Sequence, residues 1–314
     1  MRRVMRVLIV TNMQATPQRP ALGSFVADQV AALRVTGEAE IEVHAFPPGS
    51  PGAYVRAGQE LHRRWRGTRF DIVHAHFGLT AWPARAVAAR VHAVTLHGTD
   101  LVHPRSRALT LAVLPLLDLV AVVSDPLAVL VPRWATRGRA PAILPTGVAL
   151  DRFRRIDRRH ARTQLGLDPD RRHLLFPADP ARPEKRFDRA REVAGETELR
   201  ALGAVAPLEV PLHVNAADAV LVPSERESFG LAALEALACD VPVLSTPVGV
   251  APLALAGVQG ALCAEFDADR WRAALRPHLA AADPRIEGRA HAEPWSAEAM
   301  ARRVLDAWRS ALSR

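Results

Sequence analysis

The chain has few of the residues that would mark a secreted, disulfide-linked or membrane-spanning protein. Only two cysteines, Cys239 and Cys263, occur among 314 residues, which gives no disulfide framework and is typical of a reducing compartment. The longest apolar region, 109–131, is broken by prolines and aspartates, so it predicts a helix, a strand and a helix rather than a membrane span. The opening segment 1–10 lacks a small-residue cleavage site, and we interpret it as a first strand rather than a signal peptide.

Lysine is nearly absent, because Lys185 is the only lysine among 41 Lys and Arg residues in a chain of net charge +8. The arginines concentrate near the middle of the chain in a run that could meet anionic lipid headgroups, although such a run is more often a solvated linker. No recognition fold or interleaved aromatic residues accompany the charge, so nucleic acid is not expected as a partner. The arginines of this run are Arg152, Arg154, Arg155, Arg158, Arg159, Arg162, Arg171 and Arg172.

Short apolar strands alternate with helical patterns along the chain, which predicts parallel sheets covered by helices. With 314 residues, of which 49% are hydrophobic, the chain can fill two cores. Strands are expected near 4–10, 40–45, 71–75, 92–96, 119–124 and 142–145, and again near 173–177, 219–222, 242–245 and 260–264. We therefore predict a first domain over 1–150, a linker over 151–172, a second domain over 173–294 and a C-terminal helix over 295–314.

The most informative segment sets two carboxylates, Glu227 and Glu235, eight residues apart across the start of a helix. Ser228 is expected to cap this helix, and the carboxylates then lie about 10 Å apart along its axis. The N–H groups at the helix start and the helix dipole suit a diphosphate; these groups belong to Phe229, Gly230 and Leu231. Acidic residues near helix N-termini are common without such a site, but apolar strands on both sides place this motif where α/β sheets bind ligands.

In this segment the sequence resembles the family 4 retaining glycosyltransferases of GT-B fold, whose signature joins two glutamates in the same way. Other segments that resemble the family follow in its order: Val7–Met13, Gly23–Gln29, Asp71–His76, Thr95–Asp100, Ala121–Ser124, Leu144–Val148, Phe176–Phe187 and Val210–Asp218. The resemblance implies two Rossmann-like domains of doubly wound parallel sheets facing a central cleft. The first would be the acceptor side, the second would bind the nucleotide-sugar donor, and the C-terminal helix would cross back to the first.

The resemblance also implies roles for individual residues. His97, Arg182, Lys185 and Glu227 would be catalytic, whereas Gly23, Phe229, Gly230, Leu231 and Glu235 would bind the donor and His76 and Asp100 would lie on the acceptor side. The family is assigned a front-face displacement with retention at the anomeric carbon, in which cationic side chains stand in place of a metal ion. No metal or cofactor beyond the nucleotide-sugar is therefore expected.

The resemblance implies transfer of a hexose or N-acetylhexosamine to a glycan, lipid-linked or small-molecule acceptor, in the cytoplasm or at the inner face of the cell membrane, as in cell-envelope synthesis. Ser228 and Asp240 stand where the family usually has glycine, and the second domain is short. These departures leave open a degenerate sugar-nucleotide-binding partner protein, and a nucleotide-sugar epimerase is a further alternative. A zinc site is another alternative. His74 and His76 alternate on one expected strand, and His97 and Asp100 lie at the end of a nearby one. No cysteine or second acidic cluster completes a coordination shell.

Overall fold

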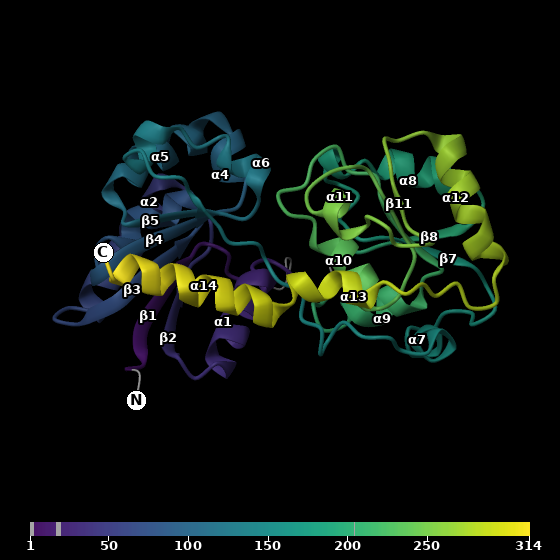
Figure 1. Cartoon of the computed structure of the whole chain (residues 1–314), viewed down its shortest axis with the longest axis horizontal. Helices are drawn as coiled ribbons and strands as arrows, with labels where there is room; N and C mark the ends of the chain where they lie inside the picture. The colour runs from purple at the N-terminus through teal and green to yellow at the C-terminus, as the bar shows by residue number, and fades with distance from the viewer. Residues whose placement is uncertain (1–2, 17–19, 204) are drawn as a thin grey trace. The chain divides into compact units, whose positions relative to one another are not determined.

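The computed structural model describes residues 3–16, 20–203 and 205–314, which form two compact units (Figure 1). Unit 1 contains residues 3–16, Leu22–Gly147 and Ala297–Arg314. Unit 2 contains residues 20–21 and Val148–Ser296. The chain therefore leaves unit 1, builds unit 2, and returns to unit 1 with its last helix.

The described residues of unit 1 form a parallel six-stranded sheet in the order β2-β1-β3-β4-β5-β6. The strands are β1 (Met5–Thr11), β2 (Ala39–Ala45), β3 (Arg69–His76), β4 (Ala88–Leu96), β5 (Leu119–Val122) and β6 (Ala142–Ile143). The central strands are buried on both faces, which explains their continuous apolar runs. Because β2 and β3 flank β1, the strand order reverses beside β1, and ligands of such sheets bind outside the carboxyl ends at this point.

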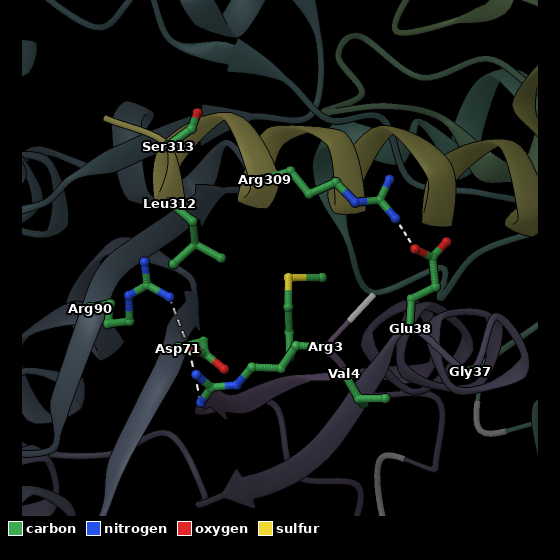
Figure 2. A pocket seen from close by; sticks show the side chains of 10 residues that line it. Arg3, Val4, Gly37, Glu38, Asp71, Arg90, Arg309, Leu312 and Ser313 are labelled. Atoms are coloured by element: carbon green, nitrogen blue, oxygen red, sulfur yellow. Dashed lines mark hydrogen bonds and ion pairs between the residues drawn. The ribbon is translucent and has the colours of Figure 1, made fainter. Parts of the chain in front are cut away.

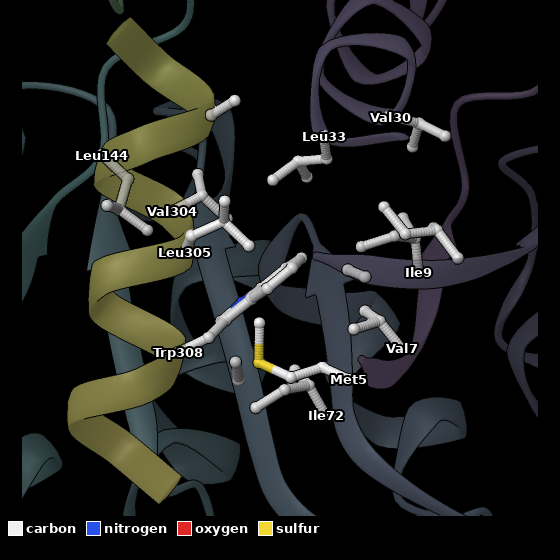
Figure 3. Packing of buried hydrophobic residues seen from close by; sticks show 14 of the residues in the cluster. Met5, Val7, Ile9, Val30, Leu33, Ile72, Leu144, Val304, Leu305 and Trp308 are labelled. Carbon is white, nitrogen blue, oxygen red and sulfur yellow. The ribbon is translucent and has the colours of Figure 1, made fainter. Parts of the chain in front are cut away.

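Helices and short 3₁₀ turns connect these strands. They are α1 (Ser24–Val35), α2 (Pro51–Arg64), η1 (Gly78–Thr80), α3 (Ala81–Ala84), α4 (Thr99–Val102), α5 (Pro104–Val113), η2 (Leu114–Leu116), α6 (Asp125–Ala128), η3 (Arg133–Thr136) and α14 (Ala297–Leu312). The apolar face of α14 packs Met300, Val304, Leu305 and Trp308 against β1 and α1, and the Trp308 ring is fully buried (Figure 3). The core of unit 1 thus includes the end of the chain.

The described residues of unit 2 form a parallel five-stranded sheet in the order β11-β10-β9-β7-β8. Its strands are β7 (His173–Phe176), β8 (Glu198–Ala201), β9 (Ala219–Val222), β10 (Val243–Ser245) and β11 (Leu262–Cys263). Its helices and turns are α7 (Arg158–Gln164), η4 (Pro183–Lys185), α8 (Phe187–Ala194), α9 (Val210–Ala216), α10 (Leu231–Ala238), α11 (Ala251–Ala254), α12 (Ala268–Ala280), α13 (Arg289–Ala292) and η5 (Glu293–Trp295). Here the strand order reverses between β7 and β9, which makes this junction the expected ligand site of the unit.

The segment 151–172, predicted as a linker, instead belongs to unit 2. Asp218, whose side chain is fully buried, pairs with the guanidinium groups of Arg158, Arg162 and Arg172 at 2.5, 2.7 and 3.2 Å. A buried carboxylate requires such partners, because an uncompensated charge in the interior is costly. Arg158, Arg162 and Arg172 therefore form an ion-pair cluster around Asp218, whereas Arg155, Arg159 and Arg171 are exposed, as expected for a solvated run.

Several other arginines of this run pair with acidic residues at the surface. Arg155 contacts Asp283 and Arg159 contacts Asp170, at 3.1 and 2.5 Å between the charged atoms. Among the residues that the structure describes, no helix is both long enough and apolar enough to cross a bilayer.

Candidate functional site

The glutamate motif and the lysine segment of unit 2 leave two neighbouring strands at their carboxyl ends. Segment 177–186 follows β7 and segment 223–230 follows β9, on either side of the point where the strand order reverses. The two segments are joined by the N–H of Glu225, which donates to the carbonyl of Glu184 at 2.9 Å. The sheet therefore brings together residues that lie about forty positions apart in sequence, as a switch-point site requires.

Lys185 and Glu227 meet at the centre of this site. The Lys185 ammonium lies 2.6 Å from both Glu227 carboxylate oxygens, and the side chains are only 13% and 12% exposed. The Ser224 hydroxyl donates to Glu227 Oε1 at 2.7 Å, so the carboxylate is held from two sides. An ammonium has three N–H donors, and Lys185 can contact a second anion while it holds Glu227.

Gly230 and Gly249 shape the backbone beside this pair. Gly230, rather than Ser228, is the N-cap residue of α10, at φ 93°, so the prediction that Ser228 takes this position was wrong. Gly249 lies at φ 58°, and a Cβ there would sit 2.3 Å from the Phe229 carbonyl oxygen and 3.0 Å from Glu227 Cβ. Only glycine fits at 249, because both the backbone angle and the space exclude a side chain.

Two other predicted site residues, one donor-binding and one catalytic, lie on this unit. Glu235 is the fifth residue of α10, so it lies just over one turn inside the helix. Arg182 donates to Glu184 Oε1 from Nε and Nη2 at 3.0 and 2.7 Å, and its side chain is 55% exposed. The structure thus brings Lys185 to Glu227 and directs the Arg182 guanidinium to its own segment.

Unit 1 gathers its predicted residues at the carboxyl ends of β1, β3 and β4. Gly23 is the N-cap of α1 at φ 80°, and a Cβ there would lie 2.2 Å from the Met13 carbonyl oxygen, so the loop after β1 must have glycine. Two residues further on, Phe25 packs its ring on His97 with 4.8 Å between ring centroids. His97 follows β4 directly.

Three histidines, which we call the histidine stack, lie under this edge: His74 and His76 on β3, and His97 after β4. Their rings stack in succession, with 5.0 Å between the centroids of the first pair and 5.3 Å between those of the second. His76 Nδ1 lies 3.1 Å from His97 Nε2. Burial lowers the pKa of all three below the ordinary value, that of His76 to about 4, so all three are neutral near pH 7.

His76 and Asp100, predicted on the acceptor side, have supporting positions. The His76 side chain is 1% exposed and Asp100 is fully buried. The Asp100 carboxylate accepts the backbone N–H groups of Gly78, His97 and Gly98 at 2.7 to 3.2 Å, which fixes the turns after β3 and β4. Both side chains are therefore buried within unit 1, and their acceptor-side role stays a prediction.

Metal ligation by the histidine stack finds no support in its arrangement. Across residues 3–16, 20–203 and 205–314, no group of three His, Cys, Asp or Glu side chains is arranged to hold a metal ion. Four of the six ring nitrogens of the stack instead make hydrogen bonds, to one another, to Thr95 and to Trp308.

A cavity of about 470 Å³ in unit 1 lies at the other end of the sheet, where β1, β3 and β4 begin (Figure 2). Its buried Asp71 carboxylate accepts the Arg6 N–H at 3.0 Å and pairs with Arg90 at 3.4 Å. Although Asp71 and His76 belong to the same strand and the same sequence motif, they therefore lie at opposite ends of the strands.

Family models match both halves of the chain. The model described as Glycosyltransferase Family 4 matches residues 3–152, and the model described as Glycosyl transferases group 1 matches residues 168–280. A D-inositol 3-phosphate glycosyltransferase of Frankia alni is 32% identical over 78% of this chain and 75% of its own length. The chain belongs to glycosyltransferase family 4. This confirms the family that the sequence motifs indicated.

Other relatives of this family 4 chain are longer. A D-inositol 3-phosphate glycosyltransferase of Geodermatophilus obscurus is 32% identical over 67% of this chain, which spans 60% of that relative's length. Among solved structures, sucrose-phosphate synthase of Thermosynechococcus elongatus has a TM-score of 0.73 at 18% identity, covering 98% of this chain and 99% of the other. HepE of Anabaena in complex with UDP-glucose has a TM-score of 0.72 at 15% identity, covering 98% and 100%. These structures confirm the GT-B fold of two Rossmann-like domains.

Sequence reasoning missed two residues of this candidate site. Ser224 orients Glu227, and its own carbonyl accepts the Thr246 hydroxyl at 2.5 Å, which ties the motif to the strand β10 beyond α10. Gly249 holds the chain against Phe229, as described above. Ser224 had a sequence signal, because it lies between the end of a buried strand and the first glutamate of the motif. Gly249 had none, because its close contact is made across two loops.

Proposed function

We propose that this chain is a retaining glycosyltransferase that moves a hexose or N-acetylhexosamine from a nucleotide-sugar to a small-molecule, glycan or lipid-linked acceptor without a metal ion. The observation that carries the proposal is the Lys185–Glu227 pair at the carboxyl ends of β7 and β9. Family membership supports the reaction class. The name of the inositol 3-phosphate relatives supports a small acceptor, and the UDP-glucose bound to HepE supports a nucleotide-sugar donor.

In this proposal Lys185 faces the diphosphate of the donor. Its remaining N–H donors, and the backbone N–H groups at the start of α10, would stabilise the negative charge that develops on the leaving diphosphate. Glu227, held by Lys185 and Ser224, would accept hydrogen bonds from hydroxyls of the transferred sugar. Glu235 in α10 would bind the ribose. Catalysis would then be positioning and charge stabilisation, with the diphosphate helping to deprotonate the acceptor.

The decisive experiment incubates the purified chain with UDP-, GDP- and ADP-sugars and candidate acceptors, and follows nucleoside diphosphate release and product by NMR. We expect transfer with retention of the anomeric configuration, and equal rates with and without EDTA. An inverted product would contradict the retaining mechanism, and activity lost in EDTA and restored by manganese or zinc would contradict metal independence. Donor binding without any release or transfer would instead support a degenerate binding protein.

The variant Lys185→Arg tests the assigned role of the lysine. A guanidinium is planar and larger than an ammonium, and the crowded contact with Glu227 leaves it a poor fit, so transfer should fall about tenfold or more despite the conserved charge. The matched control is Arg276→Lys in α12, an exposed position outside the site. Unchanged transfer by Lys185→Arg would remove the phosphate role from Lys185.

We place the protein in the cytoplasm, a proposal supported by its two free thiols, Cys239 and Cys263.

We also propose contact with an anionic membrane, on a different surface from the basic run. In unit 1, the segment 102–137 contains both exposed apolar side chains and exposed arginines: Val102, Leu109, Leu116, Val129 and Trp134, and Arg105, Arg107, Arg133 and Arg137. Apolar groups among cations suit an anionic bilayer surface. Flotation with phosphatidylserine vesicles should retain the parent and lose Trp134→Ser, and no flotation of the parent would contradict it.

A further inference from the structure

The histidine stack has a defined pattern of hydrogen bonds at its inner end. The Trp308 indole N–H donates to His74 Nδ1 at 2.9 Å, and the other ring nitrogen of His74, Nε2, lies 2.8 Å from the Thr95 hydroxyl. An indole nitrogen can only donate, so His74 Nδ1 accepts and the proton of the neutral ring is on Nε2. His74 therefore donates to Thr95, and its tautomer is fixed by α14.

The hydrogen bond between the outer two rings of the stack contains a single proton. His76 Nδ1 and His97 Nε2 are 3.1 Å apart, and both rings are neutral because burial lowers their pKa. One of the two nitrogens must donate and the other must accept. The distance alone allows either direction.

The far nitrogen of His76 decides the direction. His76 Nε2 is buried and has no hydrogen-bond partner. If His97 donated, the proton of His76 would sit on Nε2 as a buried N–H without an acceptor, which is rarer and more costly than an acceptor lacking one partner. With the proton of His76 on Nδ1, its Nε2 is instead an acceptor without a hydrogen-bond partner. His76 therefore donates and His97 Nε2 accepts.

We propose that His76 is a positioning residue that holds His97 as the tautomer protonated on Nδ1. His97 then presents an N–H donor, because its Nδ1 makes no hydrogen bond to any residue that the structure describes. The Phe25 ring at 4.8 Å restrains the imidazole from its face. This inference rests on the proposed function for its consequence: His97 hydrogen-bonds an oxygen of donor or acceptor and does not serve as the general base. The geometry of the pair stands without that function.

The tautomer can be measured without any turnover. The full chain, labelled with ¹⁵N-histidine, is examined near pH 7 by long-range ¹H–¹⁵N correlation, and His97 is assigned by the loss of its signals in His97→Gln. We expect His97 to be protonated on Nδ1 and unprotonated on Nε2. We expect His74 to be protonated on Nε2 and unprotonated on Nδ1. A His97 protonated on Nε2, or on both nitrogens, overturns the proposal. This outcome is independent of whether any donor sugar is ever transferred.

Variants then separate positioning from packing. His76→Leu removes the donor, and His97 should shift toward the tautomer protonated on Nε2 while kcat falls about tenfold. His76→Asn keeps an amide N–H near the position of Nδ1 and should recover most of the rate. The matched control is His74→Phe, which also removes a buried ring of the stack but leaves the His76–His97 bond, so the His97 tautomer should not change. If His76→Leu leaves the His97 tautomer unchanged, His76 does not set it; if these variants fail to fold, the spectrum of the parent chain decides.

Discussion

Replacing Lys185 with methionine should destabilise unit 2 because the substitution leaves the Glu227 carboxylate without its cation. This carboxylate is 12% exposed and would keep its hydrogen bond from Ser224. Removing one partner of a fully buried pair costs about 3–5 kcal/mol, and a hydrogen bond to a charged group contributes about 1.5–3 kcal/mol. Since both side chains keep some contact with solvent, we expect a loss of about 2–3 kcal/mol.

A double-mutant cycle isolates this interaction. Glu227→Gln in the Lys185→Met background removes the unpaired charge, so the double variant should be more stable than the sum of the single losses, by about 2 kcal/mol. Hydrogen exchange of peptides within Val148–Ser296 measures the opening of unit 2 separately from unit 1. The control is Arg276→Met, which should change exchange little. Additive single effects, with a coupling below about 0.5 kcal/mol, would refute the reasoning.

Three further predictions concern the glycine, the glutamates and the histidine stack. Gly249→Ala should lower the free energy of unfolding by about 2–4 kcal/mol and weaken nucleotide binding, measured by thermal melts and calorimetry, because its Cβ would meet the Phe229 carbonyl; parent-like values would contradict the clash. Glu235→Gln should weaken nucleoside diphosphate binding while Glu227→Gln mainly lowers turnover, and equal loss of affinity in both would count against this division. The histidine stack should make the protein less stable as the pH falls from about 6.5 to about 5. Burial lowers the pKa of these rings in the folded state, so the unfolded chain binds protons first. Each ring then lowers the free energy of unfolding by up to about 1.4 kcal/mol per pH unit. Urea titrations that show no such slope would refute it.

The sequence predicts the sheets well because their signal is local. Buried parallel strands are short apolar runs, and the run Ala219–Val222 is seen as strand β9 with the same bounds. Strand ends are less certain: β11 covers only Leu262–Cys263 where 260–264 was expected. Its end depends on pairing with β10, which the pattern of a single strand does not contain.

The errors concern residues whose role depends on distant partners. The segment 151–172 has the composition of a linker, and only the position of Asp218, some sixty residues later, makes Arg158 and Arg162 internal. Asp240 is similar: at φ 57° it stands where the family usually has glycine, and its carboxylate accepts the N–H groups of Gly288 and Arg289. Aspartate tolerates this conformation better than most residues, and the two hydrogen bonds account for its presence. No local pattern announces a partner forty-eight positions away.

The path of the chain through the two units has a consequence for biosynthesis. Residues 297–314 complete the core of unit 1, yet the ribosome makes them only after all of unit 2. Until then the surface of β1 that Trp308 covers stays exposed to solvent, whereas unit 2 already has its whole sequence and can fold first. A nascent chain stalled before residue 297 should therefore contain a folded unit 2 and an incomplete unit 1 that chaperones recognise. Packing of α14 onto unit 1 should then release the protein from the chaperones.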